Sequence, residues 1–219
     1  MTMAVASMHD KTYAYLSPLT WDQNAVPYCE RWGYERFLLD YPGDVPHGFA
    51  KIRFLKEICE TRPDIEWIFW KDCDGLIMNF TIRIEDRTDP NYHCLLTTVG
   101  QSGINNGMML IRNSPQGRDY LAMIYDHVHR PECRSHFLVE QKVMADTLDA
   151  NRHLVKIVPQ RQFNAGVYSD FSHGAITSLL DGLGTEGHWQ PGDWIMHWPG
   201  EQHDQRLRVC QKYLAQVIL

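Results

Sequence analysis

The residues best suited to do chemistry are Asp72 and Asp74, two carboxylates separated by one residue at the end of the apolar run 67–70. Alternate residues of an extended chain point the same way, so both carboxylates can bind one hard cation. Such a cation can in turn bridge the two phosphates of a nucleotide donor. A turn capped by aspartate gives the same pattern, so the pair alone leaves a metal site and a structural turn both open.

The setting of this pair favours the cation. Two carboxylates beside a buried strand repel each other and lose hydration, which is costly without a cation or a basic partner. Lys71 is the nearest basic residue in the sequence, but the alternation of a strand directs it to the opposite face. The negative charge of the two carboxylates therefore requires a cation, or a basic residue from another part of the chain.

A second apolar run, 194–196, ends in His197 and is followed by Pro199 and Gly200, which break the strand pattern. A neutral imidazole at this place can complete the protein ligands of a metal. Alone, His197 is better explained as a histidine at the edge of the core that donates to a backbone carbonyl, and only its pairing with Asp72 and Asp74 makes it a candidate ligand. Together with two carboxylates and diphosphate oxygens, it suits manganese better than magnesium and does not resemble a closed zinc site.

The elements that position Asp72, Asp74 and His197 are predicted from short apolar runs rich in Val, Ile, Phe and Trp. These runs predict strands at 3–7, 34–39, 65–70, 94–99, 108–111 and 154–158. Helices are predicted at 48–61, 115–129, 137–148 and 205–217, with Lys51 on the polar face of the first, and loops at 41–47 and 182–192. Strands that alternate with helices predict an α/β sheet, in which ligands bind at the carboxyl ends of the strands.

Length and composition narrow the class of protein. The chain of 219 residues suits one domain, 1–219, and its formal net charge of −6 argues against a nucleic-acid partner. Six scattered cysteines indicate free thiols in a reducing cytosol. Neither a signal peptide nor a run of about 20 apolar residues is evident, so we expect no membrane span and a cytoplasmic location.

A family resemblance is carried first by the run WIFWKDCDGLIMN at 67–79, with Ala50-Lys51-Ile52 and Leu55 ahead of it. These residues resemble the donor-binding core of glycosyltransferase family 34, a family of galactosyl-, mannosyl- and xylosyltransferases. The resemblance implies the GT-A fold, with a Rossmann-like mixed central sheet flanked by helices. It continues in order, over nearly the whole chain, through Asn24, Tyr28, Gly33-Tyr34, 104–107, 110–113, Glu140-Gln141, 158–160, Asn164-Ala165, Gly192-Asp193 and His197.

The resemblance also implies roles for individual residues. Asp72, Asp74 and His197 would hold the metal, and Lys51 would face the nucleotide or its phosphates. Glu140 and Gln141 stand where the family usually carries Asp-Gln, and Glu140 would act as a nucleophile or as a stabiliser of an oxocarbenium-like state. The donor-binding set is Ser7, Lys51, Asp72, Cys73, Asp74, Asn105, Asn106, Gly107, His197 and Gly200, with Asn105 to Gly107 as a loop beside the sugar. The reaction would retain configuration and use a nucleotide-diphosphate sugar, by family habit a UDP-sugar, with a carbohydrate or other hydroxyl-bearing acceptor.

Two departures from the family limit what can be carried over. No membrane anchor is evident, which suggests a bacterial or viral cytosolic enzyme, and Glu201-Gln202-His203 replaces the family's usual cysteine, which leaves acceptor contacts and some phosphate contacts open. A catalytically silent nucleotide-sugar-binding domain on the same fold is the alternative function. A nucleotidyltransferase is disfavoured, because Ser7-Met8-His9-Asp10 replaces the Gly-rich basic loop that cradles a triphosphate.

Overall fold

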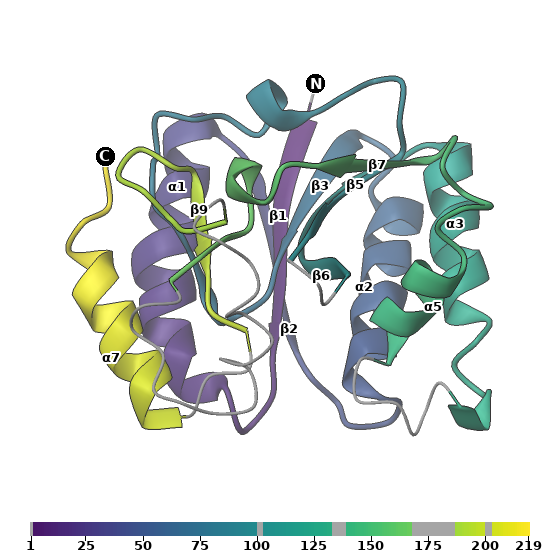
Figure 1. Cartoon of the computed structure of the whole chain (residues 1–219), viewed down its shortest axis with the longest axis horizontal. Helices are drawn as coiled ribbons and strands as arrows, with labels where there is room; N and C mark the ends of the chain where they lie inside the picture. Colours follow the sequence, from purple (N-terminus) through teal and green to yellow (C-terminus); the bar gives the residue numbers. More distant parts are fainter. Residues whose placement is uncertain (1, 100–102, 133–138, 168–186, 200–202) are drawn as a thin grey trace.

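The computed structural model describes residues 2–99, 103–132, 139–167, 187–199 and 203–219. A six-stranded sheet crosses the centre of the molecule in the order β2-β1-β3-β6-β5-β7 (Figure 1). Its strands are β1 (Thr2–His9), β2 (Glu35–Asp40), β3 (Ile65–Lys71), β5 (Cys94–Thr98), β6 (Ile104–Arg112) and β7 (Val155–Val158). Only β6 runs antiparallel to its neighbours, so β1, β3 and β5 end at the same edge of the sheet.

The strand β3 lies in the middle of this sheet and is apolar on both faces, as expected for a strand covered by helices on both sides. Ile68 and Trp70 join one hydrophobic cluster, while Trp67 and Phe69 join another on the opposite face. Helices α2 (His47–Thr61), α3 (Pro115–Tyr125) and α5 (Glu140–Asp146) cover the first face. The π-helical segment η2 (Pro18–Ala25) and helix α1 (Val26–Trp32) cover the other, as Figure 1 shows for α1.

A second, three-stranded sheet packs beside the first and is composed of β4 (Gly75–Ile77), β9 (Ile195–His197) and β8 (Ala165–Gly166), in the order β4-β9-β8. Helix α7 (His203–Leu214) packs against this sheet, on the same side of the molecule as α1 (Figure 1). Their shared core includes Leu76, Met196 and Trp198 from the strands and Val209 and Cys210 from the helix. Short helical turns η1 (Ala14–Leu16), η3 (Glu85–Arg87) and η5 (Gln160–Gln162) complete the elements named for the described residues.

The predicted α/β sheet is confirmed, and all six predicted strands are present with ends shifted by a few residues. Three expectations are wrong. Residues 18–32 form helical structure that was not predicted. The loop expected at Asn105, Asn106 and Gly107 lies inside β6, where Asn105 pairs with Thr97. Lys51 is only 4% exposed, because Glu140 of α5 and Asn106 of β6 pack against its ammonium. Residues 137–138 and 182–186 of the predicted helix and loop lie outside the described residues.

No helix within the described ranges has both the length and the apolar character needed to cross a membrane. The cytoplasmic location expected from the sequence stays a prediction. Cys29, Cys59, Cys73, Cys94 and Cys210 carry free thiols, in line with the expectation for the cysteines, while Cys133 lies outside the described residues.

Candidate active site

The two carboxylates lie in the turn that connects the two sheets. β3 ends at Lys71 and β4 begins at Gly75, so Asp72, Cys73 and Asp74 form the link between them. The amide of Asp72 donates to the carbonyl of Gly107 at 2.7 Å, and the amide of Trp198 donates to the carbonyl of Asp74 at 3.1 Å. A turn held at both ends, rather than the alternation of an extended strand, thus brings the carboxylates together.

Lys71 stabilises this turn through hydrogen bonds to its backbone carbonyls. Its side chain is fully buried, and its ammonium donates to the carbonyl of Gly75 at 2.8 Å and to that of Asp72 at 3.4 Å. Burial lowers the pKa of Lys71 to about 8. As expected, Lys71 does not pair with the carboxylate of Asp72; it binds backbone carbonyls of the turn instead.

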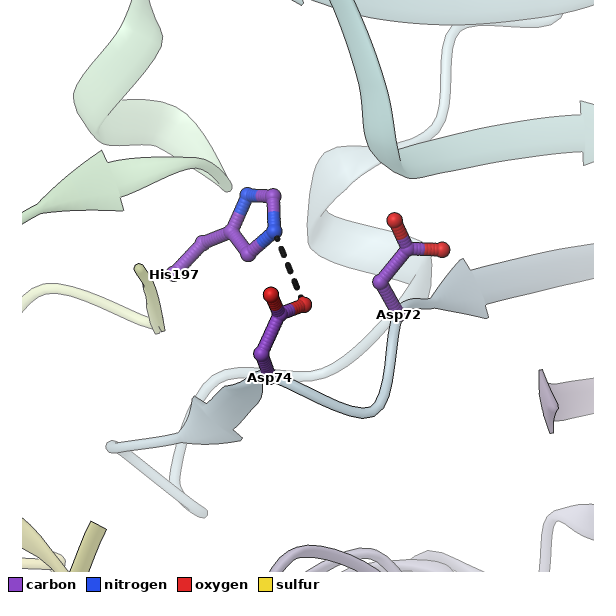
Figure 2. A group of neighbouring side chains, drawn as sticks. All are labelled: Asp72, Asp74 and His197. Carbon is purple, nitrogen blue, oxygen red and sulfur yellow. Dashed lines mark ion pairs between the residues drawn. The ribbon is translucent and has the colours of Figure 1, made fainter. Parts of the chain in front are cut away.

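His197 reaches the carboxylates through strand pairing. In the antiparallel pair β4–β9, His197 stands opposite Gly75, next to Asp74. Its Nε2 lies 3.3 Å from Oδ1 of Asp74, and one ligand atom from each of Asp72, Asp74 and His197 lies within 4.8 Å of the others (Figure 2). The predicted metal-binding residues therefore converge from two different sheets.

Asn164 fixes the orientation of the imidazole, a role that the sequence did not reveal. Its amide nitrogen donates to Oγ1 of Thr97 at 2.8 Å and to Oδ1 of Asn105 at 2.9 Å, so its oxygen must face Nδ1 of His197, 2.8 Å away. Nδ1 therefore carries the proton, and the lone pair of a neutral imidazole lies on Nε2. Nε2 is buried and has no hydrogen-bond partner, which is the state that a metal ligand requires.

Replacing Asn164 with alanine should weaken manganese binding by about 10- to 100-fold, because the partner that holds a ligating imidazole contributes that much to metal affinity. Manganese binding in the presence of UDP, followed by electron paramagnetic resonance, measures the change. Asn151→Ala is the matched control, because the Asn151 amide makes only a local bond to the carbonyl of Thr147. Equal manganese affinity in Asn164→Ala and Asn151→Ala would rule out this role for Asn164.

Gly107 forms the wall of the site opposite the turn. A Cβ atom at this position would lie 2.3 Å from Cε1 of His197 and 2.9 Å from Oδ2 of Asp72, closer than side chains tolerate. The space is thus reserved for the ligand side chains themselves. With the free Nε2 and the two carboxylates, this close fit suits a single cation of the kind that takes oxygen and imidazole ligands.

For Gly107→Ala we expect at least a tenfold loss of manganese affinity, because the added methyl group displaces His197 or Asp72. Isothermal titration of the protein with manganese and UDP measures this loss. Thr98→Ala, on the exposed side of the neighbouring strand β5, should bind as the unmodified chain does. Unchanged manganese affinity in Gly107→Ala would show that the ligands are not held as the structure places them.

A buried ion pair adjoins the carboxylates. The ammonium of Lys51 lies 2.8 Å from Oε1 of Glu140 and 3.8 Å from Oδ1 of Asp72, and it donates to Asn106 at 3.2 Å. The amide nitrogen of Asn106 donates to the same Oε1 of Glu140 at 2.8 Å. Glu140 itself is 4% exposed and packs against Gly48. Lys51, Asn106 and Glu140 therefore form one closed network next to Asp72.

Both partners of this pair remain charged despite their burial. Burial acts to lower the pKa of Lys51, but the charges of Asp72 and Glu140 outweigh it, and the pKa is raised. Burial acts to raise the pKa of Glu140, but Lys51 and Asn106 bring it below its usual value. Lys51 thus brings a positive charge to the edge of the cluster of Asp72, Asp74 and His197. That Lys51 faces the nucleotide or its phosphates stays a prediction.

Comparison with known proteins bears on this arrangement directly. Residues 4–91 match the model of the galactosyl transferase GMA12/MNN10 family, glycosyltransferase family 34. Over these residues the chain is similar to this family. The matched residues contain Lys51, Asp72 and Asp74, whereas Glu140 and His197 lie beyond them.

The similar proteins are named as galactosyltransferases. The chain is 26% identical over 223 residues to an uncharacterised alpha-1,2-galactosyltransferase of Schizosaccharomyces pombe, with 81% of this chain and 54% of that protein covered. It is 23% identical over 190 residues to an alpha-1,2-galactosyltransferase of the same organism, with 68% of this chain and 50% of that protein covered. The chain therefore spans about half the length of these relatives.

The fold of this chain is GT-A. A glycosyltransferase involved in the glycosylation of the major capsid of PBCV-1 has a similar structure, with a TM-score of 0.75 and 16% identity over 97% of this chain and 100% of that one. The mixed central sheet flanked by helices, expected from the family resemblance, is confirmed.

The remaining residues of the predicted set have different places. Ser7 is buried in β1, one residue beyond Ala6, which pairs with Trp70 of β3. Gln141 accepts a hydrogen bond from the amide of Asn106 at 3.3 Å, which brings it to the network of Glu140. Cys73 lies between the two carboxylates in the turn, and burial raises the pKa of its thiol. Gly200 lies outside the described residues.

Proposed function

We propose that this chain is a metal-dependent, retaining glycosyltransferase, with residues 1–219 as one catalytic domain. It moves a sugar from a UDP-sugar to the hydroxyl of a carbohydrate or other acceptor. The observation that carries the proposal is the convergence of Asp72, Asp74 and His197, with Nε2 of His197 buried and unpartnered beside the carboxylates. The similarity of residues 4–91 to the family 34 model and the GT-A fold support it.

The metal is manganese, with magnesium as the weaker choice, held by Asp72, Asp74 and His197. When bound, it supplies a Lewis acid that neutralises negative charge on the departing nucleoside diphosphate. Lys51, whose ammonium lies 3.8 Å from Asp72, adds a fixed positive charge on the α2 side of the same place. Asn164 keeps the imidazole of His197 in the tautomer that can bind a metal.

Glu140 acts as a charge that positions its neighbours rather than as a nucleophile. Its Oε1 accepts hydrogen bonds from both Lys51 and Asn106, and its Oε2 lies against Gly48, so neither oxygen is free to attack a sugar. A nucleophile must present an exposed oxygen to the anomeric carbon. The geometry therefore favours same-face attack by the acceptor, with Glu140 holding Lys51 and Asn106 in place.

The donor to test first is UDP-galactose, because two similar proteins are named as alpha-1,2-galactosyltransferases. The side-chain amide of Asn105 bonds Asn164, which holds His197, and an amide at this place can hydrogen bond the hydroxyl groups of a sugar. The proposal for the acceptor goes no further than a hydroxyl-bearing carbohydrate.

The test is a thermal-shift screen with UDP- and GDP-sugars, each with and without manganese, since a ligand of the native state raises its melting temperature. We expect a shift with UDP-sugars that requires manganese, followed by release of UDP when acceptor sugars are added. Binding without transfer or hydrolysis over prolonged incubation would favour the silent binding domain. No shift with any nucleotide sugar would refute the proposal.

A further inference from the structure

A buried arginine of the C-terminal helix lies close to the metal site and is not explained by the roles assigned so far. Arg206 lies in the first turn of α7, and Val209 and Cys210 follow it by three and four residues, so the three share one face of the helix. Val209 and Cys210 pack in the core formed with β4 and β9. The same face therefore directs Arg206 toward the strands that carry Asp74 and His197.

The surroundings of Arg206 hold the guanidinium but do not satisfy it. The residue is 9% exposed, and its guanidinium carbon lies 4.3 Å from the centre of the Tyr13 ring, a cation–π contact. A hydrogen bond to the Tyr15 hydroxyl engages part of the group. Nε is buried and has no hydrogen-bond partner, and among the described residues Arg206 forms no salt bridge with a carboxylate. A buried guanidinium with an unused N–H is costly unless a ligand completes it.

The packing of α7 places Arg206 beside the metal-binding turn. The core that contains Val209 and Cys210 also contains Leu76 of β4, a strand that begins directly after Asp74, and Met196 and Trp198, which flank His197. Tyr13, on which Arg206 is stacked, packs against the same core. Tyr13 follows β1, whose carboxyl end lies at the same edge of the sheet as that of β3. Arg206 and the Asp72–Asp74 turn are therefore neighbours.

We propose that Arg206 binds the diphosphate of the nucleotide donor. This inference rests on the proposed function and adds to it a residue that lies beyond the part of the chain that matches the family model. An arginine can place two N–H groups on phosphate oxygens, and its charge needs no protonation step. Lys51 is engaged by Glu140 and Asp72 on the α2 side of the site, whereas Arg206 approaches from α7 with an N–H still free. The diphosphate thus meets cations from both sides of the metal-binding turn.

The alternative is that Arg206 only neutralises Asp74 in the folded protein. If Arg206 binds the diphosphate, its substitution weakens the binding of UDP but not that of uridine, which has no phosphates. If Arg206 only neutralises Asp74, its substitution changes the binding of both ligands alike. We would titrate UDP with manganese into the unmodified chain, Arg206→Gln, Arg206→Lys and Arg208→Gln, and measure uridine binding by saturation-transfer NMR. Arg208 is an exposed arginine of the same helix and serves as the matched control.

For Arg206→Gln we expect UDP affinity to fall by about 10- to 100-fold, the usual cost of a lost charge-assisted contact, with uridine affinity unchanged. Arg206→Lys, which keeps the charge and most of the packing, should lose less, and Arg208→Gln should match the unmodified chain. UDP affinity that changes less than about twofold in Arg206→Gln, or uridine affinity that falls by the same factor as UDP, would overturn the assignment. If the unmodified chain binds neither UDP nor GDP with manganese, the proposed function itself fails, and that result is distinct from a failure confined to Arg206.

Discussion

Asp74→Ala and His197→Ala should each lower kcat/KM for sugar transfer by on the order of 10³-fold, about 4 kcal/mol of lost transition-state stabilisation. Each substitution removes one of three protein ligands from a site whose ligand atoms lie within 4.8 Å of one another. Less metal is then bound, so less charge on the departing diphosphate is neutralised. Steady-state transfer from UDP-galactose measures the rate, and manganese binding by electron paramagnetic resonance shows whether the metal is lost with it.

The control for these two variants is Asp149→Asn. Asp149 is an exposed carboxylate that pairs only with Arg152 on the surface, where such pairs contribute little. It should keep full activity and full manganese binding. Transfer at the unmodified rate in both Asp74→Ala and His197→Ala would remove the metal site from the proposal.

Lys51→Met should destabilise the fold by about 3–5 kcal/mol, the usual cost of leaving one partner of a buried ion pair without its counter-charge. Methionine approximates the length of the lysine stem, so the change chiefly removes the ammonium that contacts Glu140 at 2.8 Å. Glu140 then stays buried at 4% exposure with Asn106 as its remaining named partner. Urea unfolding monitored by circular dichroism measures the loss in the free energy of unfolding.

A double-mutant cycle separates the ion pair from other effects of the substitution. Lys51→Met combined with Glu140→Gln should be less destabilised than the sum of the two single variants, because the pair is removed as a unit. The pH dependence gives a second check. The pKa of Glu140 is lowered by folding, so its contribution is fully present above the unfolded pKa of about 4.5 and is lost as the pH falls through the folded pKa. Strict additivity in the cycle would show that Lys51 and Glu140 do not depend on each other.

The convergence of Asp72, Asp74 and His197 could be predicted from the sequence because each follows an apolar run that ends abruptly. Strand ends at one edge of an α/β sheet meet, so Asp72, Asp74 and His197 were expected together. The way in which they meet differs from the prediction. The carboxylates converge through a turn instead of an extended strand. His197 reaches them because it pairs with Gly75 in a second sheet that the sequence did not predict. Three-residue strands such as β4 and β9 are too short to show a clear alternation.

The residues that support the site could not be found by pattern alone. Lys51 has the spacing of a solvent-facing helix residue, and only the packing of α5, which brings its counter-charge Glu140, explains its burial. Asn105 and Gly107 resemble turn residues, but pairing of β6 with β3 and β5 outweighs that local preference. Asn164 and Arg206 act through contacts with residues distant in sequence, and no local period marks such contacts.

The turn of Asp72 to Asp74 is also a covalent link between two separately hydrogen-bonded sheets. Asp72 belongs to the end of the six-stranded sheet, whereas His197 belongs to the three-stranded one, and α7 packs against the latter. The proposed ion, bound by both, would act as a cross-link that resists separation of the two sheets. We therefore expect removal of the metal to loosen β4, β9 and α7 as one unit.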